Sequence, residues 1–64
     1  MRGKVLAFDP SVGLGEVEAV DGRVFPFHCI EIADGSRRIE VGTVVGFELI
    51  AKMGAYEAAD IRPG

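Results

Sequence analysis

His28 and Cys29 are the side chains of this 64-residue chain that could carry out nucleophilic or metal chemistry. They are its single histidine and single cysteine, whereas a zinc site needs three or four ligands. They are also sequence neighbours, and alternation along a strand would point them to opposite faces, which separates a thiol from its base. We therefore expect no enzyme, no catalytic residue, no metal, no cofactor and no small-molecule substrate.

A second possibility is contact with phosphate. Arg37 and Arg38 are adjacent in a glycine- and serine-containing loop, and guanidinium groups bind phosphate oxygens in a bidentate manner. A solvated loop explains the same pair equally well. The net charge of −3, from ten acidic and seven basic residues, attracts a polyanion poorly. This matters because phosphate neutralisation supplies most of the affinity for nucleic acid.

The composition predicts one soluble domain over residues 1–64. A single cysteine allows no intramolecular disulfide and suits a reducing compartment. The chain opens without a signal-peptide pattern and contains no apolar run that could span a bilayer. We expect a cytoplasmic protein that does not bind membranes.

A hairpin over residues 13–29 is the element that must position these side chains. Its two β-prone runs flank Asp21-Gly22, a pair typical of a type I′ turn, in which both central residues take positive φ. Alternation predicts that Phe25 and Phe27 point inward. The first strand then contributes Gly15, Val17 and Ala19 to the inner face. The outer face holds Leu14, Glu16, Glu18, Val24, Pro26 and His28.

The remaining elements are also predicted to be strands. Residues 2–8, 44–51 and 56–61 form strand-like runs, joined by turn chemistry at residues 9–13 and a loop over residues 33–41. No stretch carries a sustained helical period. Five short strands separated by glycine-containing turns predict an all-β, five-stranded antiparallel barrel, which encloses a core with few residues.

In this frame the chain resembles the cold-shock domain, a small OB-fold that binds single-stranded RNA and DNA. Gly13-Leu14-Gly15-Glu16-Val17 is similar to that family's Gly-Phe-Gly-Phe-Ile motif. The run from Phe25 to Ile32 is similar to Val-Phe-Val-His-Phe-Ser-Ala-Ile, with His28 on the family's histidine. The match covers nearly the whole chain. It implies a cold-shock-like OB-fold barrel and the nucleic-acid-binding residues Lys4, Phe8, His28, Arg37, Arg38 and Lys52.

The departures from the family fall on its aromatic, base-stacking platform. The platform positions that have lost their aromatic residue are Ala7, Leu14, Glu16, Pro26, Cys29 and Ser36. Each base stacked on an aromatic side chain contributes about 1–3 kcal/mol, so the losses predict weak binding. Glu16 in addition places a negative charge where a phosphate backbone would pass.

Two functions therefore stay open. The resemblance implies weak binding of single-stranded RNA or DNA. The missing aromatics and the net acidity favour a protein-interaction module with an unidentified protein partner. In that case a contiguous apolar patch would form the partner surface. The candidates for this patch are Leu6, Ala7, Val12, Leu14 and Pro26.

Overall fold

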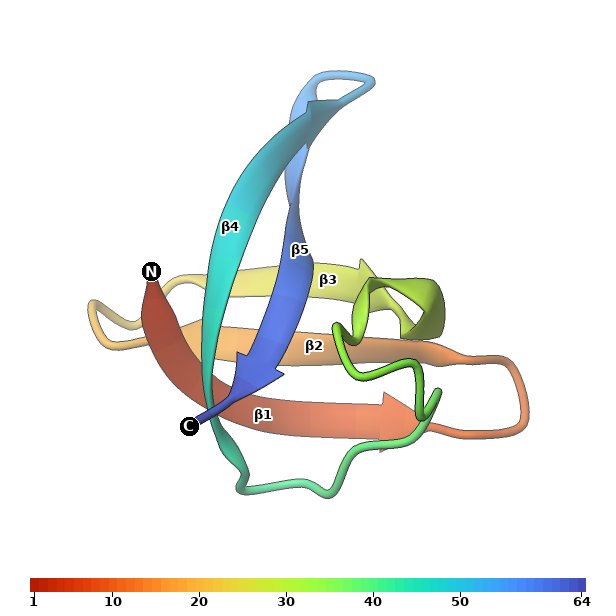
Figure 1. Ribbon diagram of the computed structural model, residues 1–64. Coiled ribbons are helices and arrows are strands. Elements are labelled where there is room, and N and C mark those ends of the chain that lie inside the picture. The colour runs from red at the N-terminus through yellow and green to blue at the C-terminus, as the bar shows by residue number, and fades with distance from the viewer.

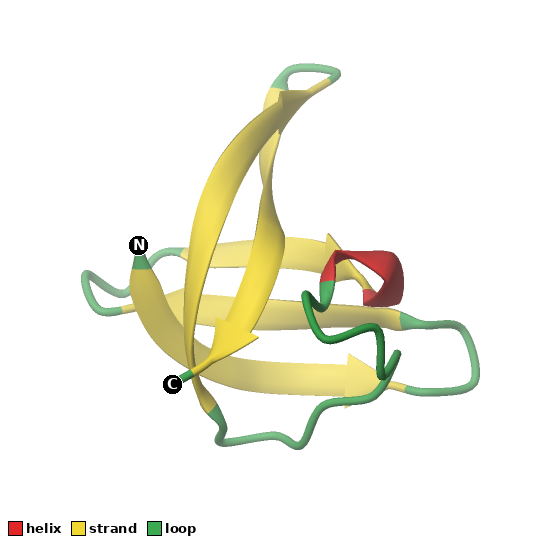
Figure 2. Cartoon of the chain, viewed as in Figure 1, coloured by secondary structure: helices red, strands yellow, loops and turns green.

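The computed structural model describes all 64 residues and contains five strands and one short helical turn (Figures 1 and 2). The elements are β1 (Arg2–Asp9), β2 (Leu14–Ala19), β3 (Val24–His28), η1 (Cys29–Glu31), β4 (Val44–Lys52) and β5 (Ala55–Pro63). All ladders are antiparallel, in the order β3-β2-β1-β4-β5. The prediction of five antiparallel strands is confirmed. No helix has the length and apolar character needed to cross a bilayer.

Strand β1 is the centre of the sheet because it pairs with β2 along most of its length and with β4 near its start. The β1–β2 register shifts between Val5 and Ala7, so Leu6 is the extra residue of a β-bulge. Such a bulge bends a strand and strengthens its twist. In Figure 1 the β4–β5 hairpin crosses in front of β1–β3. The core cluster takes side chains from both parts of the sheet.

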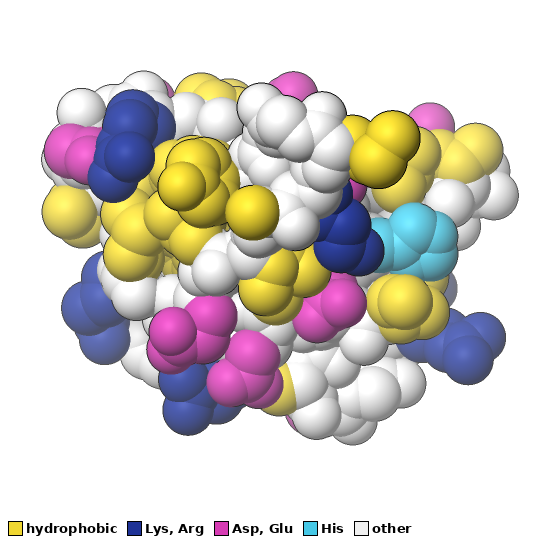
Figure 3. Space-filling model, turned by 90° about the horizontal axis from the view of Figure 1, so that it is seen from above, with side chains coloured by type: hydrophobic (Ala, Val, Ile, Leu, Met, Phe, Trp, Pro, Cys, Tyr) yellow, Lys and Arg dark blue, Asp and Glu magenta, His cyan; other side chains and the backbone are white.

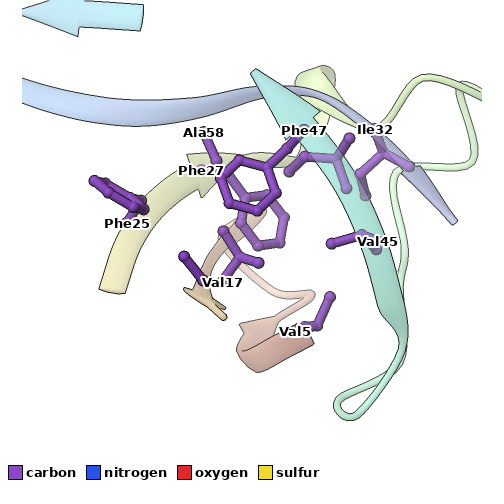
Figure 4. Close-up of a cluster of buried hydrophobic side chains, with 10 residues drawn as sticks. Val5, Val17, Phe25, Phe27, Ile32, Val45, Phe47 and Ala58 are labelled. Carbon is purple, nitrogen blue, oxygen red and sulfur yellow. The ribbon is translucent and has the colours of Figure 1, made fainter. Parts of the chain in front are cut away.

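The core follows from the alternation along the strands. Phe25 and Phe27 of β3 are buried, as predicted, and the buried Val17 packs with them in one cluster (Figure 4). The β4–β5 hairpin adds Phe47, whose ring centroid lies 6.3 Å from that of Phe25 in a tilted arrangement. The other members of the cluster are Val5, Ala19, Ile32, Val45, Ala58 and Ile61. No polar or charged residue is buried, so packing alone stabilises this core.

The prediction that the five strands close into a barrel is wrong, because the sheet stays open. The edge strands β3 and β5 share no ladder. Ile32, which follows η1, forms an isolated parallel bridge with Ile61 of β5, and the Ala33 N–H donates to the Ile61 carbonyl at 2.8 Å. The chain leaves β3 at Cys29 to form η1, so no strand continues alongside β5. Asp60, at φ +50°, also interrupts the extended backbone of β5 beside the bridge.

The β2–β3 turn also differs from the prediction. Gly22 has φ +93°, but Asp21 does not have a positive φ, so the turn is not type I′. The Gly22 N–H donates to the Ala19 carbonyl at 2.9 Å, and the Ala19 N–H donates to the Arg23 carbonyl at 2.8 Å. This is the three-residue hairpin loop in which a turn is followed by a glycine with positive φ.

Candidate nucleic-acid interface

The outer faces of β1, β2 and β3 form one surface, which we call the platform face. Its side chains lie in three rows set by the strand register. From one end of the sheet to the other, the rows are Asp9–Leu14–His28, Ala7–Glu16–Pro26 and Lys4–Glu18–Val24. All nine residues are exposed. The predicted outer face of the hairpin is therefore confirmed.

Ala7, Leu14 and Pro26 surround Glu16 in the middle of the platform face. The four residues line one shallow depression, whose floor includes Gly15, Phe8 and Phe27. We call it the platform depression. Leu14 is 52% exposed, and Asp9 also lines the depression, which therefore presents apolar surface beside two carboxylates. The two remaining members of the predicted apolar patch, Leu6 and Val12, do not line it.

Phe8 lies on the inner side of the sheet and is only partly buried. The bulge at Leu6 shifts the alternation along β1, so Phe8 pairs with the inward-facing Gly15. Its ring lies parallel to that of Phe27, with centroids 6.0 Å apart and an interplanar angle of 8°. A Cβ at Gly15 would lie 2.6 Å from Phe27 Cζ, so glycine is what leaves room for this ring. Phe8 also borders two hollows on the surface.

The second hollow opens between the end of β1 and the loop that precedes β4. We call it the loop hollow, and its lining residues are Phe8, Pro10, Arg38, Ile39, Glu40 and Val41. Its volume of about 680 Å³ falls within the roughly 300–1,000 Å³ typical of ligand pockets. It places the predicted residues Phe8 and Arg38 on one cavity. Sequence reasoning missed Ile39 and Val41, because ordinary apolar loop residues carry no chemical signal.

Local hydrogen bonds shape the loop that presents Arg38. The Asp34 carboxylate accepts from the Ser36 N–H at 2.9 Å, and the Ser36 hydroxyl donates to the Arg38 carbonyl at 2.8 Å. The backbone hydrogen bond from Ser36, followed by its side-chain hydrogen bond, lowers the pKa of Asp34. Arg37 has φ +60°. It is exposed and adjacent in the chain to Arg38, which lines the loop hollow. Ser36, where the family has an aromatic residue, thus supports the loop backbone.

His28 ends β3 at the surface, where hydrophobic side chains and a basic side chain lie beside its imidazole (Figure 3). The Cys29 thiol lies 3.8 Å from His28 Nδ1, so the prediction that the two point to opposite faces is wrong. The strand ends at His28, and alternation does not extend into η1. Nδ1 already accepts a hydrogen bond of 3.5 Å from the Ile30 N–H. No group of three or more histidine, cysteine or acidic residues is placed to hold a metal ion.

The two predicted lysines lie away from the loop hollow. Lys4 is in the far row of the platform face, opposite Glu18 on β2. Lys52 is at the tip of the β4–β5 hairpin, 4.0 Å from the Glu57 carboxylate. The structure therefore brings Phe8 and Arg38 together but does not gather the six predicted nucleic-acid contacts into one basic patch.

No protein-family model matches this chain, and no curated protein matches it either.

Proposed function

We propose that this protein is a cold-shock-like OB-fold domain that binds single-stranded RNA or DNA weakly in the cytoplasm. The strand order and the single bridge between Ile32 and Ile61 support the proposal, since the OB-fold is a partly open five-stranded barrel. The positive φ of Gly13 supports it too, because this glycine opens the motif that resembles the family's Gly-Phe-Gly-Phe-Ile.

The observation that carries the proposal is the loop hollow. It combines a phenyl ring with a guanidinium group, and single-strand binding sites use aromatic stacking together with basic contacts to phosphate. Arg38 makes no ion pair within the protein, so its charge is available to a phosphate group. One base against Phe8 and one phosphate on Arg38 make a small site, and we expect a Kd weaker than about 10 µM for an oligonucleotide at low salt.

Titration of a fluorescent ten-nucleotide oligo-dT tests this site. Arg38→Gln removes one phosphate contact and should flatten the dependence of log K on log salt by about 0.7, the share of one phosphate on a single strand. Arg62→Gln is the matched control, because it removes the same charge from an arginine that already pairs with Glu48 and Asp60. Equal salt slopes for both variants and the wild type would reject the site. Submicromolar binding at 150 mM salt would reject the expectation of weak binding.

A second candidate function is protein binding through the platform face. The observation that favours it is the platform depression, where three apolar side chains lie beside two carboxylates, those of Asp9 and Glu16, and no basic side chain lines the wall. A contiguous exposed apolar patch often marks a partner surface. This surface is separate from Arg38, so the two functions can be tested independently.

A further inference from the structure

We infer that the platform face binds an extended, cationic segment of a partner protein, with an apolar residue followed by basic residues at alternate positions. This inference rests on the second candidate function and specifies the partner's chemistry. It starts from the charges of the face. The carboxylates of Asp9, Glu16 and Glu18 stand against two basic side chains, those of Lys4 and Arg2, which line one hollow together with Glu18.

Neither glutamate of β2 makes an ion pair within the protein, although Glu18 lies opposite Lys4 of β1. The ion pairs of the structure involve other acids, and no basic side chain lies within 4.0 Å of Glu16 or Glu18. Neither carboxylate makes a hydrogen bond, whereas Asp9 accepts from the Ser11 N–H and hydroxyl. Two free carboxylates therefore extend from β2 toward any molecule that docks on this face. They repel a nucleic-acid backbone and attract a lysine or an arginine.

The spacing of the outward side chains along β2 indicates how the apolar and basic side chains of the partner segment are spaced. Leu14, Glu16 and Glu18 are two residues apart, which corresponds to about 6.7 Å along a strand. An extended segment aligned with β2 repeats its side chains at the same interval. An apolar side chain then meets Leu14 and Pro26, while basic side chains at the second and fourth following positions meet Glu16 and Glu18.

The apolar part of the contact has a defined place. Leu14 and Pro26 line the platform depression together with Ala7, and all three are exposed. None of the nine residues in the three rows is aromatic, and Phe8 and Phe27 contribute only to the floor of the platform depression, so no ring projects from the face for a base to stack on. Apolar surface combined with unpaired negative charge matches a basic peptide and does not match single-stranded nucleic acid.

Backbone amide NMR with a synthetic peptide tests the inference. The probe is acetyl-Gly-Leu-Ser-Lys-Ser-Lys-Gly-amide, and its control is a peptide of the same composition with the two lysines adjacent. We expect the probe to shift the amide signals of Leu14 and Glu16 and to bind more tightly than the control. Glu16→Gln should weaken binding of the probe by about two- to fivefold, as expected for one exposed ion pair.

Glu48→Gln is the matched variant, because it removes the same charge from an exposed residue of β4 outside the platform face and should leave binding unchanged. Equal affinity for both peptides, or an equal effect of the two variants, would overturn the proposed partner chemistry while leaving a protein-binding face. No shift on β2 with either peptide would reject the face itself. Concentration-dependent shifts of Leu14 without peptide would assign the face to a second copy of the chain and overturn the inference.

Discussion

Gly15→Ala is expected to destabilise the domain because the new methyl group has no space on the inner face of β2. A Cβ at this position would lie 2.6 Å from Phe27 Cζ and 2.7 Å from the Ala7 carbonyl oxygen. The ring cannot move freely, since Phe27 is buried in the core and stacked on Phe8. The carbonyl cannot move without disturbing the β1–β2 ladder, in which Ala7 pairs with Glu16.

Overpacking of this kind costs about 1–3 kcal/mol of unfolding free energy. Replacing glycine by alanine also reduces the entropy of the unfolded chain, which returns about 0.4–1 kcal/mol. Taken at the middle of both ranges, about 2 less about 0.7, the net loss is about 1.3 kcal/mol. For a domain of this size, 1 kcal/mol corresponds to a Tm change of about 4–8 °C, so we expect a decrease of roughly 5–10 °C.

Thermal unfolding followed by circular dichroism gives the measurement, and Gly46→Ala is the matched control. Gly46 also lies in a strand, but the nearest atom to its added Cβ is the Met1 carbonyl oxygen at the ordinary contact distance of 3.7 Å. This control should be neutral or slightly stabilising. A Gly15→Ala variant that melts with the wild type, or a control that loses as much stability, would refute the steric account of the Phe8–Phe27 stack.

Three further predictions address the turns and the platform face. Gly22→Val should lower the free energy of unfolding by on the order of 1–2 kcal/mol. The cause is backbone strain alone, because φ is +93° and no atom lies within 4 Å of an added Cβ. Identical thermal melting curves for the variant and the wild type would contradict this prediction. Restoring three aromatics on the platform face should tighten oligo-dT binding at least about a hundredfold without unfolding the domain, and a folded variant without gain would show that this face cannot bind bases. The three changes are Leu14→Phe, Glu16→Phe and Pro26→Phe. Finally, hydrogen bonds in the turns lower the pKa of Asp9, Asp21 and Asp34, so their contribution to stability is complete above the unfolded pKa and is lost as the pH falls below about 4. A Tm that rises between pH 5 and pH 3 would contradict this sign.

Much of the platform face was predictable from the sequence because strand alternation is a local property. The spacing of Phe25 and Phe27 in β3 and of Val17 in β2 is enough to orient both strands of the hairpin, and every outer residue follows from it. A slip of one residue would expose Phe27, so the apolar pattern selects the register. The number of strands follows equally from local turn residues.

The departures from local alternation were decided by tertiary structure. Counting from the buried Val5 without a bulge would place Ala7 inside and Phe8 outside. The extra residue Leu6 reverses both, and it exists because β1 must bend to pair with β2 and β4. His28 and Cys29 come within 3.8 Å because the strand ends between them, and no sequence period marks that point.

The loop hollow and the open edge of the sheet depend on contacts between distant parts of the chain. Phe8 and Arg38 are thirty positions apart, and they line one cavity only after the loop before β4 has returned to the end of β1. The single bridge between Ile32 and Ile61 likewise reflects the geometry of η1 and the kink at Asp60. Residue types and local periods determine which side chains are available, whereas long-range packing determines which of them share a cavity.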